Sequence, residues 1–462
     1  MNEYLTFGSR TKRALRLLLA GVLLGAATAR AAVPAQPMTG APVIVPPQAT
    51  PTGAVVLFSG AEGWGEAERK LAGTLAGRGQ LVIGVDTAGT LRRMAQSRDD
   101  CVTLVGEIEA VSHQAQREAG APAYHFPVLA GIGTGGTMAL QVAGQASTAT
   151  LDRVLAVDPA PTLPGSKPLC GEQAPGTGPR GSAHRAAAYE LPAGALPYGV
   201  DIRLSASAST GVRLRAGEFA TKHPQAGLAS DSQASPADAL LDGLAAPAQP
   251  AAPAAVADLP LVELPVAHPG DTFAVLYSGD GGWRDLDKQL ATILQRSGLP
   301  VVGVDVLRYF WAHRTPEQGA QDLGRIIEAY RQKWGAKKVV LIGFSFGADV
   351  LPALYNRLPA AAQAAVVQLS LLAFAAETDF EVTVSGWLEQ HRSTALPTLP
   401  EVQRIDPRRV QCFYGEDDDE AACAQIKTGA ELIHTSGGHH FDGDYDALAR
   451  RILQGIGRRD TL

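Results

Sequence analysis

The sequence has few cysteines, no excess of positive charge and no long hydrophobic run after its first 31 residues. It contains four cysteines, and 40 lysines and arginines stand against 46 aspartates and glutamates, which gives a net charge of −6. Nucleic acid attracts basic surfaces, so this balance argues against a nucleic-acid partner. No later segment reaches the ~20 apolar residues of a spanning helix, and we expect no transmembrane segment there.

Residues 1–31 have the pattern of a secretory signal peptide. Four basic residues precede the apolar run 17–27, and Ala29-Arg30-Ala31 forms a small-residue cleavage site. Its removal would leave 35 basic and 45 acidic residues, a net charge of −10. Export implies an oxidising compartment in which cysteines pair. Four cysteines allow three connectivities, of which we favour Cys412–Cys423 together with Cys101–Cys170.

Composition divides the rest of the chain into four parts. Residues 32–52 are rich in Pro, Ala and Thr, and we expect a disordered lead-in. Residues 53–225 form a first domain. Residues 226–258 are rich in Ala, Pro and Ser and predict an extended linker, in which the apolar residues near Leu240 form at most one helical turn. Residues 259–462 form a second domain.

The two domains begin with the same pattern, displaced by 219 positions. Each has an apolar strand, a glycine turn, a helix and a second strand, which is a duplicated βαβ beginning. The repeated residues of the first copy are Ser59, Gly60, Gly63, Trp64, Leu71, Ala72, Leu75, Gly79, Val82, Gly84, Val85 and Asp86. Strands and helices alternate through the second domain, as in an α/β-hydrolase. We therefore predict two tandem α/β-hydrolase-like domains, each a mostly parallel sheet with helices on both faces.

A candidate nucleophile lies in the second domain. An apolar strand at residues 337–342 leads through Gly343-Phe344-Ser345-Phe346-Gly347 into a helical pattern, the context of a nucleophile elbow. Ser345 is therefore the expected nucleophile. The matching turn of the first domain has Gly133 at this position. We expect the first domain to be a degenerate, catalytically inactive copy.

An elbow serine needs a base and an acid, which follow later strands in the order acid, then histidine. Asp418 comes after the strand 409–414 and is the favoured acid, with Asp417 as the alternate. His440 precedes an aromatic residue in a glycine-rich loop and is the favoured base, with His439 as the alternate. A metal site at these histidines is disfavoured, because neighbouring histidines rarely converge on one ion. We predict no metal and no cofactor.

The turn after the predicted strand 272–277 of the second domain is the expected oxyanion hole. Its candidate donors are the backbone N–H groups of Asp280 and Gly281, together with that of Phe346 after the nucleophile. Many acidic residues surround the predicted site, and such a rim attracts cations, so an ester with an ammonium group fits it better than an anionic one. The candidate substrate-binding residues are Trp283, Asp349 and Asp442.

Several motifs of the second domain resemble the bacterial virulence protein family VirJ, and the duplicated layout is similar to its longer AcvB-like form. These motifs are Ser278-Gly279-Asp280-Gly281-Gly282-Trp283, Tyr309-Phe310-Trp311, Arg314-Thr315-Pro316-Glu317, the elbow through Pro352, Asn356-Arg357-Leu358-Pro359, Ser385-Gly386-Trp387 and residues 437–445. The resemblance covers the second domain closely and the first more loosely.

The resemblance implies a periplasmic α/β-hydrolase of Gram-negative bacteria. AcvB-type members hydrolyse the lysyl ester of lysyl-phosphatidylglycerol, and VirJ-type members are linked to type IV secretion. The expected partners are therefore an aminoacyl-phospholipid substrate at the membrane surface and secretion-system proteins. Two alternatives stay open: a non-catalytic periplasmic factor that supports secretion, and a general carboxylesterase.

Overall fold

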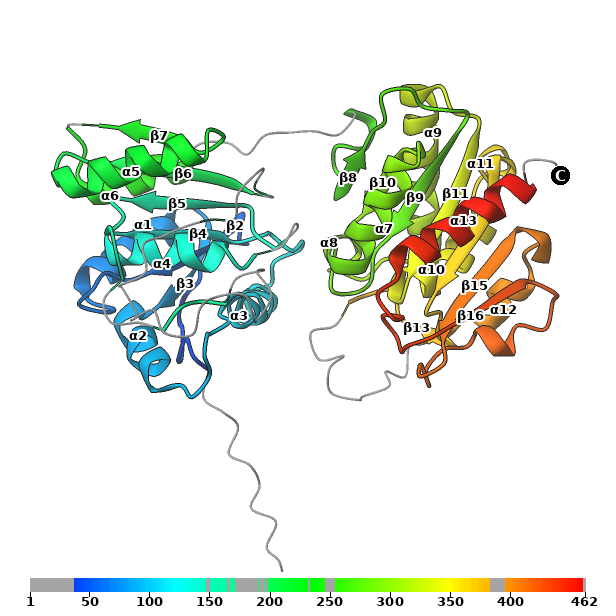
Figure 1. Ribbon diagram of the computed structural model, residues 1–462, viewed down its shortest axis with the longest axis horizontal. Coiled ribbons are helices and arrows are strands. Elements are labelled where there is room, and N and C mark those ends of the chain that lie inside the picture. The colour runs from blue at the N-terminus through cyan, green and yellow to red at the C-terminus, as the bar shows by residue number, and fades with distance from the viewer. Residues whose placement is uncertain are drawn as a thin grey trace, which may run out of the picture. The chain divides into compact units, whose positions relative to one another are not determined.

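Two seven-stranded sheets, one in each half of the chain, form the framework of this computed structural model (Figure 1). The structure describes residues 37–146, 150–163, 167–170, 191, 196, 198–231, 233–245, 254–382 and 395–459. The predicted signal peptide and the motif at residues 385–387 lie outside these ranges. Within them, no helix is both long and apolar enough to cross a membrane.

The first sheet has the strand order β1-β3-β2-β4-β5-β6-β7. Its strands are β1 (Val43–Val45), β2 (Gly53–Phe58), β3 (Gln80–Val85), β4 (Val128–Ile132), β5 (Arg153–Val157), β6 (Gly199–Leu204) and β7 (Gly227–Ser230). Apolar side chains of α1 (Glu66–Gly77) and α6 (Pro236–Ala245) cover one face. The helices of the other face are α2 (Thr87–Gln96), α3 (Val105–Glu118), α4 (Thr134–Ala143) and α5 (Thr210–Lys222).

The second sheet has the order β16-β15-β12-β11-β9-β10-β8. Its strands are β8 (Leu261–Leu264), β9 (Thr272–Tyr277), β10 (Val301–Val304), β11 (Lys338–Phe344), β12 (Val366–Leu372), β15 (Val410–Gly415) and β16 (Glu431–Thr435). One face is covered by α7 (Asp285–Arg296) and α13 (Tyr445–Arg459). The other carries α8 (Val306–Tyr309), α9 (Pro316–Trp334), α10 (Phe346–Asn356), α11 (Ala360–Ala365) and α12 (Leu399–Gln403). A small hairpin pairs β13 (Glu377–Thr378) with β14 (Leu396–Pro397).

The two sheets have the same topology, strand for strand. In each, the first strand in sequence is antiparallel and lies beside the third, and the remaining pairs are parallel. In each, the second strand lies between the third and the fourth, and the fourth is the central strand. Buried strands of this kind are rich in Val, Ile and Leu because helices cover both faces. The predicted duplication and the two α/β-hydrolase-like domains are confirmed.

The predicted disordered lead-in is wrong for residues 37–52. β1 extends the edge of the first sheet by pairing with β3. The Glu107 carboxylate accepts hydrogen bonds from the N–H groups of Met38 and Thr39, both at 2.9 Å. Arg93 Nε donates to the Met38 carbonyl at 2.7 Å. The polar composition of this segment hid its order, because helix side chains hold its backbone.

The predicted linker is also wrong over most of its length. β7 is the far edge strand of the first sheet, and α6 is a ten-residue helix in place of the single turn expected near Leu240. Leu240 is fully buried against the first sheet. Small residues hid both elements, since an exposed edge strand needs no apolar alternation and α6 buries chiefly its small and leucine side chains. Residues 246–253 lie outside the described ranges, and Val256 already packs in the second domain.

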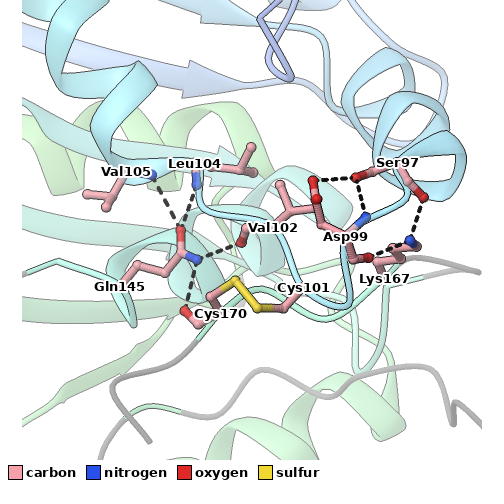
Figure 2. The surroundings of a disulfide bond; sticks show 9 residues. All are labelled: Ser97, Asp99, Cys101, Val102, Leu104, Val105, Gln145, Lys167 and Cys170. Carbon is pink, nitrogen blue, oxygen red and sulfur yellow. Dashed lines mark hydrogen bonds between the residues drawn. A yellow bond between two sulfur atoms is a disulfide. The ribbon is translucent and has the colours of Figure 1, made fainter. Parts of the chain in front are cut away.

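Both predicted disulfides are present. Cys101–Cys170 joins the segment before α3 to residues 167–170 (Figure 2). Beside it, Gln145 Nε2 donates to the carbonyls of Val102 and Cys170 at 2.8 and 2.9 Å. Gln145 Oε1 accepts from the Leu104 N–H at 2.9 Å, so this amide satisfies the loop backbone that leads into α3.

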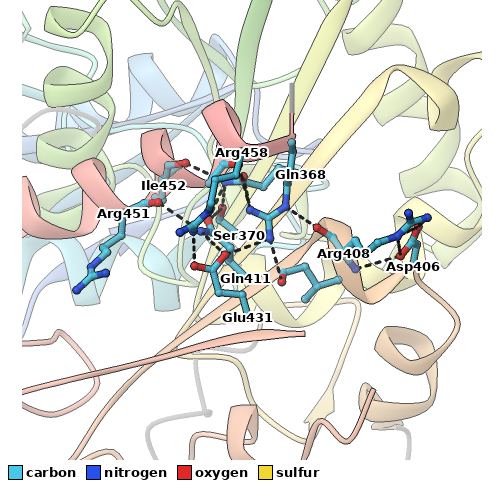
Figure 3. Close-up of polar contacts among 12 residues, drawn as sticks. Gln368, Ser370, Asp406, Arg408, Gln411, Glu431, Arg451, Ile452 and Arg458 are labelled. Carbon is cyan, nitrogen blue, oxygen red and sulfur yellow. Dashed lines mark hydrogen bonds and ion pairs between the residues drawn. The ribbon is translucent and has the colours of Figure 1, made fainter. Parts of the chain in front are cut away.

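A buried polar network fixes α13 on the second sheet (Figure 3). Gln368 of β12 donates to Gln411 Oε1 of β15 at 2.8 Å and to the Ile452 carbonyl of α13 at 3.2 Å. Arg459 Nη1 donates to Gln368 Oε1 at 3.1 Å, and Arg459 also pairs with Glu431 at the start of β16. Buried polar groups that are fully paired specify one arrangement. The network therefore sets the register of the two strands whose far ends carry the candidate acid and base.

Candidate active site

Ser345 occupies a strained turn between β11 and α10. Its backbone has φ 50° and ψ −123°, a conformation that costs a side-chain-bearing residue about 1–3 kcal/mol. Gly347 is required beside it, because a Cβ there would lie 2.4 Å from the Tyr277 carbonyl oxygen. This is the crowding expected of a nucleophile elbow. The turn lifts Ser345 to the carboxyl edge of the sheet, where loops from later strands reach it.

Two loops bring a histidine and an aspartate to Ser345. His439 Nε2 lies 2.9 Å from Ser345 Oγ, and His439 Nδ1 lies 3.2 Å from Asp418 Oδ2. The three residues follow β11, β15 and β16, so parallel strands deliver them to one edge of the sheet. A hydroxyl, an imidazole and a carboxylate in series is the arrangement that activates a serine nucleophile.

The preference for His440 over His439 is wrong. His440 is exposed, and its ring lies against Phe344 with the centroids 5.4 Å apart. The tight turn explains the exchange: the Phe441 N–H donates to the Gly438 carbonyl at 2.8 Å, and the buried Phe441 takes φ 60°. Adjacent side chains leave such a turn in different directions, and only His439 reaches Ser345. Within the described ranges, no group of three or more His, Cys, Asp or Glu residues is placed to hold a metal ion.

Asp418, rather than the alternate Asp417, is the carboxylate beside His439. Its side chain is 3% exposed, whereas Asp417 is an exposed residue. The backbone N–H groups of Glu416 and Asp417 donate to the carbonyls of Thr435 and Gly437, both at 3.0 Å. The acid loop and the histidine loop are thus joined by their backbones. The Cys412–Cys423 disulfide closes the acid loop from its other side.

The turn after β9 lies next to the nucleophile, as an oxyanion hole requires. A Cβ on Gly279 would be 3.7 Å from Ser345 Cβ, so glycine lets this backbone approach closely. The N–H groups of Asp280, Gly281 and Phe346 donate to no acceptor in the part of the chain that the structure describes. They are free to bind a substrate oxygen, and the three candidate donors stay a prediction.

Two buried carboxyl groups that the sequence did not single out lie under this turn. The Asp287 carboxyl group lies near the Gly279 N–H, and burial raises its pKa well above the usual value. Burial also raises the pKa of Asp305 to about 6. The first domain offered a signal for the first of these contacts, because Glu68 is the image of Asp287 and accepts from the Gly60 N–H at 3.2 Å. Both copies thus brace the same glycine turn with an acid from the following helix.

Trp283 was expected to bind substrate as a pocket wall, but the structure places it in the core. Its side chain is 1% exposed, and a Cβ on Gly303 would lie 2.3 Å from its ring. The indole fills the space between the glycine turn and β10, as a core side chain. Its position in a glycine-rich turn suggested a pocket wall, but the ring packs over Gly303 of β10, where no side chain occupies the space.

Asp349, which was expected to bind substrate, is buried, whereas the substrate-binding role of Asp442 stays a prediction. The Asp349 carboxylate is 8% exposed and accepts from the Ala375 N–H at 2.7 Å. Burial raises its pKa well above the usual value, and the nearby carboxylates of Asp280, Asp418 and Glu420 raise it further. Asp349 therefore holds the elbow helix to the turn after β12. Asp442 is exposed and accepts from Ser436 and from the Asp444 N–H, which shapes the histidine loop.

A cavity of about 660 Å³ lies away from these residues. It runs along α9 and α11, and Arg325, Glu328 and Ala362 are among the residues that line it. None of its lining residues belongs to the Ser345, His439 and Asp418 arrangement. The cavity therefore does not serve that site.

Comparison with known proteins gives a family match for the second domain. Residues 271–460 match the family model described as "Bacterial virulence protein (VirJ)". No curated protein matches the chain. The match spans β9 to α13, and so includes Ser345, Asp418 and His439.

Solved structures with similar folds each cover less than half of the chain. An α/β serine hydrolase without a lid from Xanthomonas campestris is 18% identical, covers 43% of this chain and 87% of its own, and has a TM-score of 0.29. An esterase from Pyrococcus furiosus is 13% identical, with 41% and 82% covered and a TM-score of 0.32. Est1E from Butyrivibrio proteoclasticus with bound ferulic acid is 10% identical, with 42% and 91% covered and a TM-score of 0.32. The fold assignment rests on the sheet order and the elbow: residues 271–460 are similar to the VirJ family model, and the domain that contains them has an α/β-hydrolase-like fold.

Proposed function

We propose that the protein is a serine ester hydrolase in which Ser345 is the nucleophile, His439 the general base and Asp418 the residue that orients His439. The observation that carries this proposal is the bridge that His439 makes between Ser345 Oγ at 2.9 Å and Asp418 Oδ2 at 3.2 Å. Such a bridge has little purpose in a purely structural turn, and it is combined with a strained serine at φ 50°.

The proposed reaction has two steps. His439 Nε2 takes the Ser345 proton while Oγ attacks the ester carbonyl, and the free N–H groups of Phe346 and Asp280 stabilise the oxyanion. Collapse breaks the ester bond, and the leaving alcohol takes the proton from His439. Water then gives a proton to His439 and attacks the acyl-enzyme, which releases the acid and restores Ser345. No step requires a cofactor.

The substrate that we propose is the lysyl ester of lysyl-phosphatidylglycerol, on the basis of the family resemblance. The charges near the site support it, since Asp280, Asp418 and Glu420 all lie close enough to Asp349 to raise its pKa. Several carboxylates beside a nucleophile favour a cationic acyl group over an anionic one. The leaving group would be the glycerol hydroxyl of phosphatidylglycerol, and the product acid would be lysine.

We also propose that the protein acts in the periplasm. The two disulfides support an oxidising compartment, and the charge and apolar pattern of residues 1–31 supports export. A connection to membrane lipid homeostasis, virulence or type IV secretion follows from the resemblance alone.

Vesicles that contain lysyl-phosphatidylglycerol test the substrate. We expect the wild type to release lysine from them and Ser345→Ala to release none above the rate without protein. Full release by the folded Ser345→Ala variant would contradict the proposed nucleophile. Rapid cleavage of short neutral esters with no release of lysine would instead favour a general carboxylesterase. Absence of both activities would favour a non-catalytic factor.

A further inference from the structure

The turn after β9, residues 278–283, carries the candidate oxyanion donors and is called the oxyanion turn below. Arg284 connects it to the first domain. Arg284 precedes α7, and its Nε donates to the Gly281 carbonyl at 2.7 Å. Its two terminal nitrogens donate to the carboxylate of Glu109 on α3 of the first domain, one of them at 2.9 Å. All three nitrogens of the guanidinium are thus used, and they join Glu109 to the residue that follows Asp280.

The ion pair lies in a larger contact between the two domains, which both belong to the compact unit Pro37–Leu462. Trp311 Nε1 donates to the Ala121 carbonyl at 2.9 Å, and the Arg117 guanidinium stacks on the Trp311 ring at 3.8 Å. Tyr124 of the first domain is 1% exposed and is part of the second domain's core cluster. α3 and the loop after it therefore pack directly beside the segments that surround the site.

The geometry favours a positioning role over a merely adhesive one. The Glu109 side chain is 10% exposed and that of Arg284 27%, so the pair is shielded from most solvent. A bidentate arginine–carboxylate pair fixes the plane of the guanidinium. Because Nε of the same plane holds Gly281, the position of Glu109 sets the position of the turn. Gly279 in that turn approaches Ser345, and a misplacement of an oxyanion donor by a fraction of an ångström is costly.

The duplication shows that this connection belongs to one copy. Arg284 is 219 positions after Gly65, which has no side chain, and Gly281 is 219 positions after Glu62. The first domain thus lacks the arginine that makes the connection. The connection is present where a nucleophile is present.

We propose that the first domain positions the oxyanion turn of the second, with Glu109 and Arg284 as positioning residues. This inference rests on the proposed hydrolase function. The first domain would then support catalysis in the second domain without carrying a catalytic residue of its own. Loss of the Glu109 carboxylate would leave Arg284 attached to Gly281 but free to swing, and the turn would sample positions unsuited to an oxyanion.

The test uses the full chain and the rate constant for covalent labelling of Ser345 by a fluorophosphonate, which forms a similar oxyanion. We expect Glu109→Gln to lower that rate constant about 10–100-fold. Arg284→Gln should lower it to a similar degree, and the double variant should fall no further than the larger single effect, since the two residues act in series. For p-nitrophenyl acetate the loss should be in kcat and not in KM.

Arg117→Gln is the matched control, because Arg117 lies on the same helix and contacts Trp311 and the Val382 carbonyl of the second domain. It should lower the stability of the protein as Glu109→Gln does and leave the labelling rate unchanged. Equal effects of both variants on labelling, or a wild-type rate for Glu109→Gln, would overturn the positioning role and leave the hydrolase proposal standing. A wild type that is not labelled at Ser345 would overturn both.

Discussion

Ser345 and Gly133 occupy the same turn in two copies of one fold, with φ and ψ of 50° and −123° in the second domain and 58° and −120° in the first. Glycine adopts this conformation without strain, whereas serine pays about 1–3 kcal/mol. The backbone of an elbow is therefore preserved without its nucleophile. Its geometry is part of how β4 and α4, or β11 and α10, pack together.

The later strands differ more than the elbows do. β15 and β16 lead to Asp418 and His439, which meet Ser345. In the first domain Ser205 follows β6 and donates to Asp158 Oδ2 at 2.5 Å, and Asp231 follows β7 and accepts from the Gln233 N–H at 2.8 Å. Ser205 thus joins the loop after β6 to the loop after β5, and Asp231 caps the loop that follows its own strand. A shared fold thus carries chemistry only where three separate loops converge.

Removal of the proposed general base should have the largest effect on activity. His439→Ala should lower the kcat of ester hydrolysis about 10⁶-fold, because Ser345 loses its base. His440→Ala is the matched control and should keep most of the activity, since its ring lies on Phe344 and in solvent. Steady-state rates of the two purified variants decide between them. A greater loss of activity in His440→Ala would identify His440 as the general base.

The paired tryptophans of the glycine turns give a stability contrast. Trp283→Ala should reduce the free energy of unfolding by about 3–5 kcal/mol, because its ring is fully buried over Gly303. The image Trp64 is only partly buried, and Trp64→Ala should cost about 1–3 kcal/mol. Urea denaturation with a probe for each domain measures both. Equal costs would show that the two turns pack equally well.

The contact between the domains should respond to acid. Burial, with help from Arg284 and Arg117, lowers the pKa of His113 from 6.5 to about 4. As the pH falls from about 6.5 to about 4, His113 binds a proton in the unfolded chain but not in the folded chain. The free energy of unfolding therefore decreases over this pH range. The wild type should lose about 2–3 kcal/mol relative to His113→Phe between pH 7.5 and 4.5. Parallel stability curves for the two proteins would contradict this assignment.

A serine introduced at Gly133 of the first domain should have the smallest effect on labelling. A side chain at Gly133 would meet no atom within 4 Å, so Gly133→Ser fits in space and pays only the strain of its positive φ. With Ser205 and Asp231 in place of a catalytic pair, the new serine should stay unreactive. The number of fluorophosphonate labels per chain should remain one, and a second label would show that the first domain retains a working site.

The sequence was most informative where local chemistry determines structure. Ser345 could be predicted because glycines at fixed spacing between a strand and a helix have one steric explanation, and Asp418 because it follows a strand on the same edge. The duplicated residues predicted both sheets. His439 could not be separated from His440, since the choice depends on the direction of side chains in a turn at Phe441.

Long-range contacts were beyond the sequence. Arg284 and Glu109 are 175 positions apart and belong to no local pattern. The order of residues 37–52 likewise depends on Glu107 and Arg93, which lie outside that segment. The Ala- and Pro-rich composition predicted a linker where α6 forms. The helix is stabilised because Leu240 packs against the first sheet.

The residue that a fluorophosphonate labels shows whether Ser345 is the nucleophile. The labelled chain would be digested and its modified peptide identified by mass spectrometry. We predict one label per chain, on Ser345, that is lost in Ser345→Ala and in His439→Ala and kept in His440→Ala. A folded wild type without a label, or with its label on another residue, would contradict it.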